Sequence, residues 1–423
     1  MSPLRTYGAW CCLLPVVALA QPGAELDLAE AADLAVQNQP ALLDLEARAR
    51  AEREQAIAAR QLPDPQLVAG ISEVPVESGD AGSLRADGDT QLQIGLTQEF
   101  PREAKRRLRG EVLEREAQRL DADVRAARAG VRRDASLAWA ETWEAEQALV
   151  LTRAALDVSE LQAQASGIAF ESSKSSQADL LTARSDATRL RDRVAGAEQT
   201  VAHARSLLSR WIGQAADRPL PADLPAMTSP PELDRLLARV QRHPLIESLA
   251  ARIAGARSQV DLAQAAYSPD WRAELGYGNR LAYADMVTFK VGIDLPFFTR
   301  NRQDREAAAA ASREEAAEHA REDALRQLVS GARLNHHDVV RITERLRTHD
   351  DLLLPQARQR ADAAASAWRA GAGSLASVLD ARRAVLEARM TRLELEADRL
   401  EHTIQLTWLG AFDAIDAPEG ASP

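Results

Sequence analysis

The feature that most constrains the fold is a long stretch without proline, between Pro101 and Pro219. From Arg102 onward this stretch is rich in alanine, arginine and glutamate, which favour helix. Its apolar residues recur at the spacing of coiled-coil helices. A helix over residues 102–165 is roughly 95 Å long, so it cannot fold back into one compact globule. The chain is therefore predicted to be mainly helical and elongated.

The residues just before Pro101 have the pattern of a β-strand. Leu92, Ile94 and Leu96 alternate with polar residues or glycine, and a similar strand precedes Pro296. Each has a strand partner upstream, which predicts two β-hairpins, at 66–100 and 270–296. One face of each hairpin is apolar and the other polar. Lipid outside and water inside explain this pattern, and so does a hairpin that covers a soluble core.

Similar segments recur about 200 residues apart, which is the signature of an internal repeat. VQNQ before Pro40 matches VQRH before Pro244, and Phe170 matches Trp368 in a later helix turn. Each unit has the order helix, hairpin, long helix, turn, return helix. The first repeat is predicted at 21–212, with long helices at 102–165 and 177–211. A linker at 213–231 joins it to the second repeat at 232–411, whose long helices are predicted at 297–369 and 375–409. A flexible tail is predicted at 412–423. Pro355 is expected to kink or break the second long helix.

The N-terminal residues have the pattern of a secretory signal peptide. Arg5 precedes an apolar run that ends in small residues, so residues 1–20 are predicted to be removed. Cys11 and Cys12 lie in this run, so no disulfide, thiolate metal site or lipid-bearing cysteine is expected in the mature chain. The sequence beyond residue 20 lacks an apolar run of transmembrane-helix length. These features predict a periplasmic or secreted protein, or a barrel shared by several chains, since four strands cannot close a membrane barrel.

The charge and the motifs argue against several function classes. The formal net charge of −11 disfavours nucleic acid as a partner. No catalytic, nucleotide-binding or zinc motif can be read, so the chain is predicted not to be an enzyme and to bind no cofactor. His336, His337 and Asp338 are the best metal candidates, but neighbouring helical residues point about 100° apart, which favours a solvated helix face.

Three segments resemble the TolC-like outer-membrane efflux proteins: QLPDPQLVAGI from Gln61, IGLTQEFP from Ile94 and WRAGAGSLASVLDA from Trp368. The resemblance covers nearly the whole mature chain. Within the family, the chain looks most like the channels of the cobalt-zinc-cadmium and copper-silver exporters. That subgroup often carries methionines where this chain has Gly88 to Leu92, so thioether chelation of a soft metal has no support here.

The resemblance implies a homotrimer in the cell outer membrane, with a shared twelve-strand β-barrel and a twelve-helix α-barrel that forms a periplasmic tunnel. It implies a passive exit duct that works with a periplasmic adaptor (a membrane fusion protein) and an inner-membrane pump of the resistance-nodulation-division type. Heavy-metal cations are the expected cargo, and drug efflux or protein secretion is the alternative. A periplasmic coiled-coil adaptor or structural protein is the rival from another class.

The resemblance also assigns residues to sites. Acidic residues after the second helix turn ring the periplasmic mouth in this family, and Asp380 occupies one such position. The other gate positions are Ser377, Asp179 and Thr182. The helix turns that would contact the adaptor contain Gly167, Phe170, Ser175, Trp368, Gly371 and Gly373. Hairpin aromatics at the membrane interface would be Trp271, Tyr277, Tyr283 and Phe289, with core packing as the alternative.

The basic run from Arg102 to Arg109 has two interpretations. It could contact anionic lipid headgroups or the inner rim of a barrel. It could also be the solvated first turn of a helix, in which case the positive charges need a partner because they oppose the helix dipole.

Overall fold

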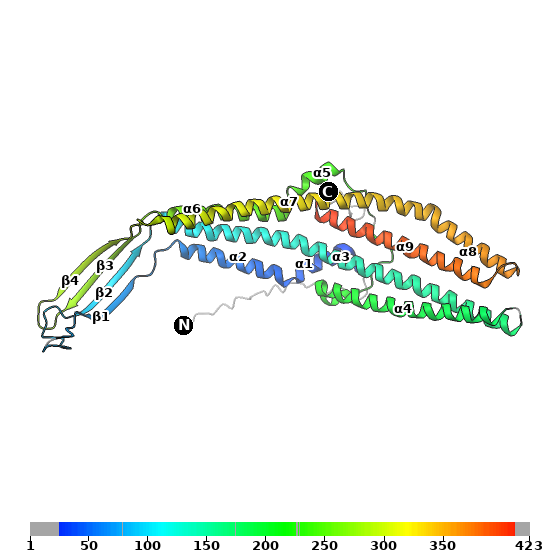
Figure 1. Cartoon of the computed structure of the whole chain (residues 1–423), viewed down its shortest axis with the longest axis horizontal. Helices are drawn as coiled ribbons and strands as arrows, with labels where there is room; N and C mark the ends of the chain where they lie inside the picture. The colour runs from blue at the N-terminus through cyan, green and yellow to red at the C-terminus, as the bar shows by residue number, and fades with distance from the viewer. Residues whose placement is uncertain (1–24, 78, 174, 226, 228, 411–423) are drawn as a thin grey trace, which may run out of the picture.

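The structure is a computed structural model that describes residues 25–77, 79–173, 175–225, 227 and 229–410. The predicted signal peptide at 1–20 and the tail at 412–423 lie outside these residues. The molecule is elongated, with a four-stranded sheet at one end and the turns of two long helical hairpins at the other (Figure 1). No helix in the described part of the chain is both long and apolar enough to cross a membrane.

The same order of elements occurs twice along the chain. The first repeat consists of α1 (Leu28–Asn38), α2 (Pro40–Ala59), β1 (Gln66–Ser72), β2 (Gln91–Phe100), α3 (Glu103–Glu171) and α4 (Gln177–Ile212). The second consists of α5 (Leu233–Val240), α6 (Pro244–Ala265), β3 (Trp271–Asn279), β4 (Met286–Ile293), α7 (Gln303–Thr348), α8 (Leu354–Arg369) and α9 (Leu375–Trp408). Pro40 and Pro244 each open a helix, where the missing N–H of proline costs nothing. The repeat in the sequence is thus a repeat in the structure.

Helix α3 has 69 residues and is about 100 Å long. It continues six residues beyond the predicted end at 165, because Ser166 and Gly167 do not stop it: the Ser166 hydroxyl donates to the Gln162 carbonyl at 2.8 Å within the helix. The N-terminus of α3 is joined to the second repeat. Asp270 accepts from the Arg102 backbone N–H at 3.0 Å and pairs with Lys105 Nζ at 2.8 Å. This aspartate offsets the unfavourable positive charge in the first turn.

The second long helix begins later than predicted, and the interruption predicted at Pro355 is present. It begins at Gln303 and not at 297, after a 3₁₀ turn at Thr299–Asn301 and a non-helical Arg302 with φ −130° and ψ −90°. A π-helical turn, His349–Leu353, then separates α7 from α8 directly before Pro355. Proline lacks the N–H for the helical ladder and clashes with the carbonyl four residues earlier. A π turn is one way to pass that defect without ending the helix.

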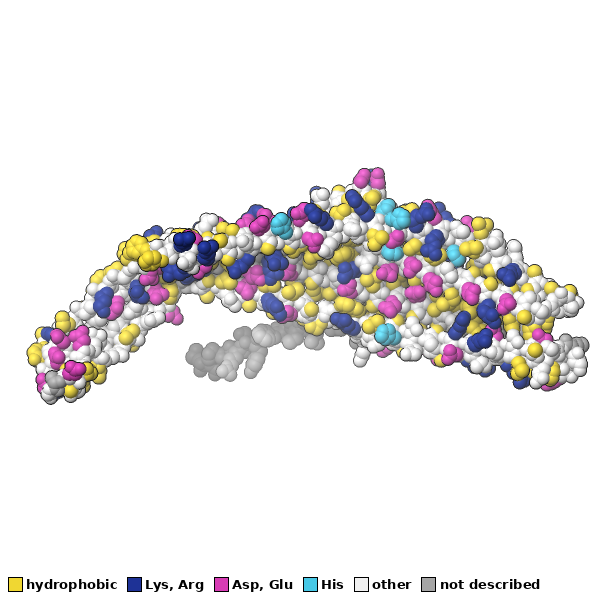
Figure 2. Space-filling model, in the orientation of Figure 1, with side chains coloured by type: hydrophobic (Ala, Val, Ile, Leu, Met, Phe, Trp, Pro, Cys, Tyr) yellow, Lys and Arg dark blue, Asp and Glu magenta, His cyan; other side chains and the backbone are white. Residues whose placement is uncertain are grey.

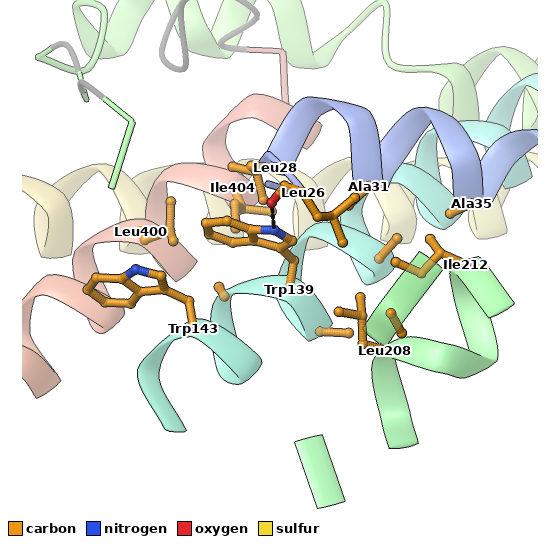
Figure 3. Close-up of a cluster of buried hydrophobic side chains, with 14 of the residues drawn as sticks. Leu26, Leu28, Ala31, Ala35, Trp139, Trp143, Leu208, Ile212, Leu400 and Ile404 are labelled. Atoms are coloured by element: carbon orange, nitrogen blue, oxygen red, sulfur yellow. Dashed lines mark hydrogen bonds between the residues drawn. The ribbon is translucent and has the colours of Figure 1, made fainter. Parts of the chain in front are cut away.

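The largest hydrophobic core lies midway along the helices, around Trp139 of α3 (Figure 3). Trp139 is fully buried, and its Nε1–H donates to the Leu26 carbonyl at 2.9 Å. Side chains from α1, α4 and α9 pack around it; among them are Ala31, Leu208 and Leu400. Alanine dominates many of the other helix contacts, which lets the backbones approach closely. This core fixes the two return helices against one long helix.

The four strands form one antiparallel sheet in the order β1-β2-β3-β4. The central pair joins the two hairpins, with Ile94 opposite Tyr277 and Leu96 opposite Leu275. Leu275 in turn lies opposite Phe289. Because side chains alternate across a strand, these apolar residues share one face of the sheet.

Candidate functional site

The turns between the long and return helices have matching backbone geometry in the two repeats. Ser173 has φ 56° in the first turn, and Gly371 has φ 74° at the equivalent position of the second. Glycine adopts this left-handed conformation without strain, whereas serine does so at a cost. Space is also tight at Gly373, because a Cβ there would lie 3.1 Å from Ala367 Cβ and 3.2 Å from the Trp368 backbone nitrogen.

Two of the predicted gate residues lie in the first turn of a return helix and bond to its N-cap serine. The Asp179 N–H donates to Ser176 Oγ at 3.1 Å, and Asp179 Oδ2 accepts from the Ser176 hydroxyl and backbone, which forms a capping box at the start of α4. The Ser176 side-chain hydrogen bond lowers the pKa of Asp179 below its ordinary value. Ser377 has the same place at the start of α9, where its N–H donates to Ser374 Oγ at 3.2 Å. The structure therefore gives Asp179 and Ser377 a local role in starting the return helices.

Asp380 is different, because its side chain is largely exposed and belongs to a small ionic network. Arg383 lies one turn further along α9 and pairs with Asp380 at 3.2 Å. The same guanidinium pairs with Asp186 of α4 at 2.8 Å, and Asp186 is the more buried of the two aspartates. Thr182, the remaining predicted gate residue, donates to the Ala178 carbonyl within α4. Asp186 and Arg383 were not among the residues predicted from the sequence.

We call the pairing of Arg383 with Asp186 the α4–α9 link. A second polar contact, from Arg382 Nη1 to Gln162 Oε1 at 3.0 Å, joins α9 to α3 beside it. Arg383 also has a raised pKa, chiefly because of its hydrogen bond to Asp186. These contacts attach the second helical hairpin to the first close to the turns. A movement that separates the two hairpins has to break them.

The predicted adaptor-contacting residues fall into two groups. Trp368 is half-buried and packs against Ala183, Leu375 and Leu379, so it is part of the core at this end. Phe170 is 41% exposed, while Gly167 lies against Leu180 and Ser175 lies near the Asp179 carboxylate. Further exposed apolar side chains near the first turn, Leu161, Ile168 and Leu181, were not singled out from the sequence. Their positions in the helical pattern resemble those of ordinary core residues, so only burial reveals them.

At the opposite end, the apolar face of the sheet is exposed to solvent. Phe289 is 70% exposed, Leu275 54% and Ile94 49%. Trp271 and Tyr277 lie on the same face, opposite Phe100 and Ile94 on the neighbouring strand. Tyr283 lies in the loop between β3 and β4, with the Arg280 guanidinium 5.7 Å from its ring centre. No helix of the described chain covers this face (Figure 1), so the alternative of core packing for the aromatics does not hold within one chain.

The other face of the sheet is polar and has many small residues. Lys290 pairs with Glu274 across neighbouring strands at 3.1 Å, and Gly95 lies opposite Gly276. An exposed apolar face of this size is unusual for a soluble monomer and marks a surface that is covered by lipid or by another protein. The sheet thus has one side suited to an apolar environment and one suited to water.

The basic run at the start of α3 has partners inside the protein. Lys105 and Arg102 contact Asp270, as described above, and Arg106 Nη1 donates to the Arg60 carbonyl at 3.0 Å. These contacts support the interpretation of a helix start that needs compensation. The interpretation of lipid contact remains a prediction for Arg107 and Arg109.

An acidic band lies on α3 and α9, midway along the helices. It consists of Glu141 and Glu144 of α3 and Glu394, Asp398 and Glu401 of α9. Burial, followed by repulsion from the other four carboxylates, raises the pKa of Glu144 to about 6. Acidic side chains gather midway along the helices on this face in Figure 2. The band concentrates negative charge where the two hairpins meet.

The raised pKa of Glu144 predicts how the stability of the protein depends on pH. Its folded-state pKa is raised, so the folded protein loses stability as the pH rises from about 4.5 to about 6, and the loss is complete above that. The shift corresponds to about 2 kcal/mol, and we reduce this to about 1 kcal/mol because the side chain is partly solvated. Glu144→Gln is expected to raise the free energy of unfolding by that amount at pH 7.5 and by little at pH 4.5, as measured by thermal melting. Equal gains at both pH values would contradict the electrostatic explanation.

His336 and His337 make ordinary structural contacts. His336 Nε2 lies 3.1 Å from the Pro231 carbonyl, and His337 Nδ1 lies 3.2 Å from Asp338 Oδ1. Within the described residues, no group of three or more histidine, cysteine, aspartate or glutamate side chains is arranged to hold a metal ion.

Comparisons with known proteins agree with this architecture. Residues 238–410 match the family described as outer membrane efflux protein, and no curated protein matches the sequence. Among solved structures, the outer membrane protein VceC from Vibrio cholerae is similar with a TM-score of 0.73 and 21% identity over 90% of this chain and 96% of that one. The Campylobacter jejuni CmeC outer membrane channel gives a TM-score of 0.77 and 13% identity, over 97% of this chain and 93% of that one. CusC gives a TM-score of 0.75 and 17% identity, over 93% of this chain and 95% of that one.

VceC is an outer membrane protein, CusC forms a transmembrane channel and CmeC is an outer membrane channel. The structural likeness spans both repeats, while the sequence match covers most of the second. The chain has the fold of the outer membrane efflux proteins.

Proposed function

We propose that this protein is the outer-membrane channel of a tripartite efflux system, a passive exit duct without catalytic activity. Three copies would share one barrel, to which each contributes its four strands, and their helices would continue it as a tunnel through the periplasm. A periplasmic adaptor and an inner-membrane pump of the resistance-nodulation-division type would complete the system. The signal peptide predicted at 1–20 fits export to that compartment.

One observation carries this proposal: the sheet at the end of the molecule has an exposed apolar face and a polar opposite face. Four strands cannot form a closed barrel alone, and the outer strands β1 and β4 each have one free edge in the described chain. Pairing β4 of one copy with β1 of the next removes every edge and turns the apolar faces toward lipid. The folds of VceC, CmeC and CusC support the same assignment.

The proposal predicts how the protein is recovered from cells. Membrane fractionation is expected to place it in the outer membrane, and mild detergent is expected to extract a trimer that dissociates on heating. Closed barrels saturate every strand edge, which gives such trimers their resistance to detergent. Recovery as a soluble periplasmic monomer would instead favour a coiled-coil adaptor or structural protein.

We further propose that the cargo is a heavy-metal cation. The acidic band on α3 and α9 supports this, because repulsion from its other four carboxylates helps to raise the pKa of Glu144, and a nearby cation would relieve that repulsion. Drug efflux is the alternative. Deletion of the gene is expected to sensitise cells to zinc, cobalt, cadmium, copper or silver salts and not to a panel of drugs; the reverse result would assign the channel to drugs.

We propose that the α4–α9 link keeps the periplasmic mouth closed and that Asp380 attracts cations there. Rupture of the link would let the second hairpin move away from the first. Because Asp186 is largely buried, the link is less screened by solvent than an ordinary surface pair.

Arg383→Gln is expected to increase the conductance of the purified channel severalfold in planar bilayers, because it removes the link and leaves the helices intact. Asp380→Ala is expected to reduce the preference for cations, and it raises conductance less because Arg383 keeps its contact with Asp186. Arg184→Gln, an exposed change on α4, serves as a matched control. Currents and selectivity unchanged from the wild type would remove Arg383 and Asp380 from the gate.

A further inference from the structure

A cavity of about 530 Å³ lies between the two helical hairpins, close to the α4–α9 link. All four helices of this end contribute to its wall: α3, α4, α8 and α9. The cavity is open to solvent on one side. Figure 2 shows basic side chains in the groove between the hairpins toward the turns.

The charge of this cavity is opposite to that of the whole chain. The protein has a formal net charge of −11, yet six arginines and only two aspartates line the cavity. The arginines are Arg189, Arg193, Arg358, Arg382, Arg383 and Arg389. The aspartates are Asp186, which is engaged in the link, and Asp362.

Four of the six arginines have no partner among the described residues: Arg189, Arg193, Arg358 and Arg389 form no ion pair or side-chain hydrogen bond. They come from α4, α8 and α9, so they approach the cavity from both hairpins. Asp186 and Asp362 are the carboxylates among the described residues of the cavity wall, and Asp186 is engaged by Arg383. Guanidinium groups bind carboxylates, sulfonates and phosphates through paired N–H bonds, and a bound anion would give these arginines the partner that they lack.

The floor of the cavity is apolar. Leu190 and Leu379 are buried beneath it, and Leu386 is half-buried. A cavity with an apolar floor and charged groups at its rim is suited to a ligand with an apolar body and one charged group. Simple inorganic ions would leave the floor uncovered.

The volume of the cavity indicates the size of the ligand that fits within it. Ligand sites for drug-sized molecules have volumes of about 300–1,000 Å³. A single turn of helix with its side chains fills roughly 400–600 Å³, as follows from a diameter of 10–12 Å and a pitch of 5.4 Å. One drug-sized molecule therefore fits within the cavity, whereas more than a single turn of a partner helix would extend out of its open side.

We propose that this cavity is a binding site for drug-sized amphipathic anions, with an apolar or aromatic body and a carboxylate, sulfonate or phosphate group. The anion contacts Arg189 of the first hairpin and Arg358 of the second, and its apolar part covers Leu190 and Leu379. The site is distinct from the expected cation cargo, because its charge has the opposite sign. It does not depend on the proposed channel function, since the cavity is formed within one chain.

The test is isothermal titration calorimetry of the purified full-length protein in an uncharged detergent, with 2-naphthalenesulfonate as the probe. Saturable binding is expected with a Kd below roughly 1 mM, given the small size of the probe. The uncharged analogue 2-naphthalenemethanol is expected to bind at least about tenfold more weakly, because it lacks the group that the guanidiniums recognise.

Two pairs of variants locate the site. Arg189→Gln with Arg358→Gln is expected to raise the Kd for the sulfonate by roughly tenfold or more. Arg184→Gln with Arg360→Gln removes the same charge from exposed positions on the same two helices outside the cavity, and is expected to leave the Kd nearly unchanged. Melting temperatures of both double variants are compared with the wild type to verify folding.

Three results would overturn the proposal: no saturable binding by the wild type, equal binding of the sulfonate and the alcohol, or equal weakening by the two double variants. The first two need no variant, so a folding defect cannot obscure them. If Arg189→Gln with Arg358→Gln does not fold, Arg193→Gln with Arg389→Gln takes its place with the same expectation.

Discussion

Phe289→Arg is expected to abolish recovery of the protein from the outer membrane, whereas Thr288→Arg is expected to leave it there. Phe289 lies in the middle of β4 on the apolar face and is 70% exposed in the single chain. An arginine facing lipid near the middle of a bilayer costs about 2–4 kcal/mol, and three copies in one barrel cost roughly 6–12 kcal/mol. Thr288 is its neighbour on the polar face, where a charge stays in water.

This pair of variants distinguishes lipid from water as the environment of the apolar face. If water covered the apolar face, replacing an exposed phenylalanine by arginine would change stability by less than about 0.5 kcal/mol. Outer-membrane fractions probed by immunoblot, with and without heating, report both location and trimer formation. Normal recovery of Phe289→Arg, or loss of both variants alike, would contradict the assignment of this face to lipid.

Trp139→Ala is expected to lower the free energy of unfolding by about 3–5 kcal/mol. Trp139 is fully buried among side chains from α1, α3, α4 and α9, so its removal leaves a cavity where four helices meet (Figure 3). The substitution also leaves the Leu26 carbonyl without its donor. A fall in melting temperature measured by circular dichroism on the purified protein is the readout.

Two control variants separate the contributions at Trp139. Trp139→Phe keeps most of the ring and loses the hydrogen bond, so a cost of about 1–2 kcal/mol is expected. Leu161→Ala removes a side chain that is 65% exposed and is expected to change stability by less than about 0.5 kcal/mol. A similar loss for Trp139→Ala and Leu161→Ala would show that this core does not determine stability.

The local elements of the fold could be predicted because local patterns specify them. The absence of proline after Pro101 and the spacing of the apolar residues predict α3, and alternation predicts the strands. The predicted ends of these helices were less accurate than their existence. Helix α3 continues to Glu171, because the residue that ends it is defined by the left-handed conformation of Ser173 and not by Ser166 or Gly167. The sequence of the turn does not require a left-handed serine there.

The candidate site was predictable only in part. The resemblance singled out Asp380 and the repetition singled out the helix turns, and their roles stay predictions. The partner of Arg383 could not be identified, because Asp186 belongs to the other repeat and no periodic pattern connects the two positions. The exposure of Ile168 and Leu181 was also hidden, since exposed and buried apolar residues look alike in a helical pattern.

The sequence by itself determined the duplicated units, the long helices, the amphipathic strands and the absence of cysteine beyond residue 12. These properties follow from short-range spacing and composition. Only the tertiary structure decided that both hairpins form one sheet with an uncovered apolar face, that Asp186 and Arg383 join the two repeats, and that arginines from three helices surround one cavity. The physical reason is that such contacts depend on how the helices pack against one another, which brings together residues roughly 200 positions apart that no local pattern relates.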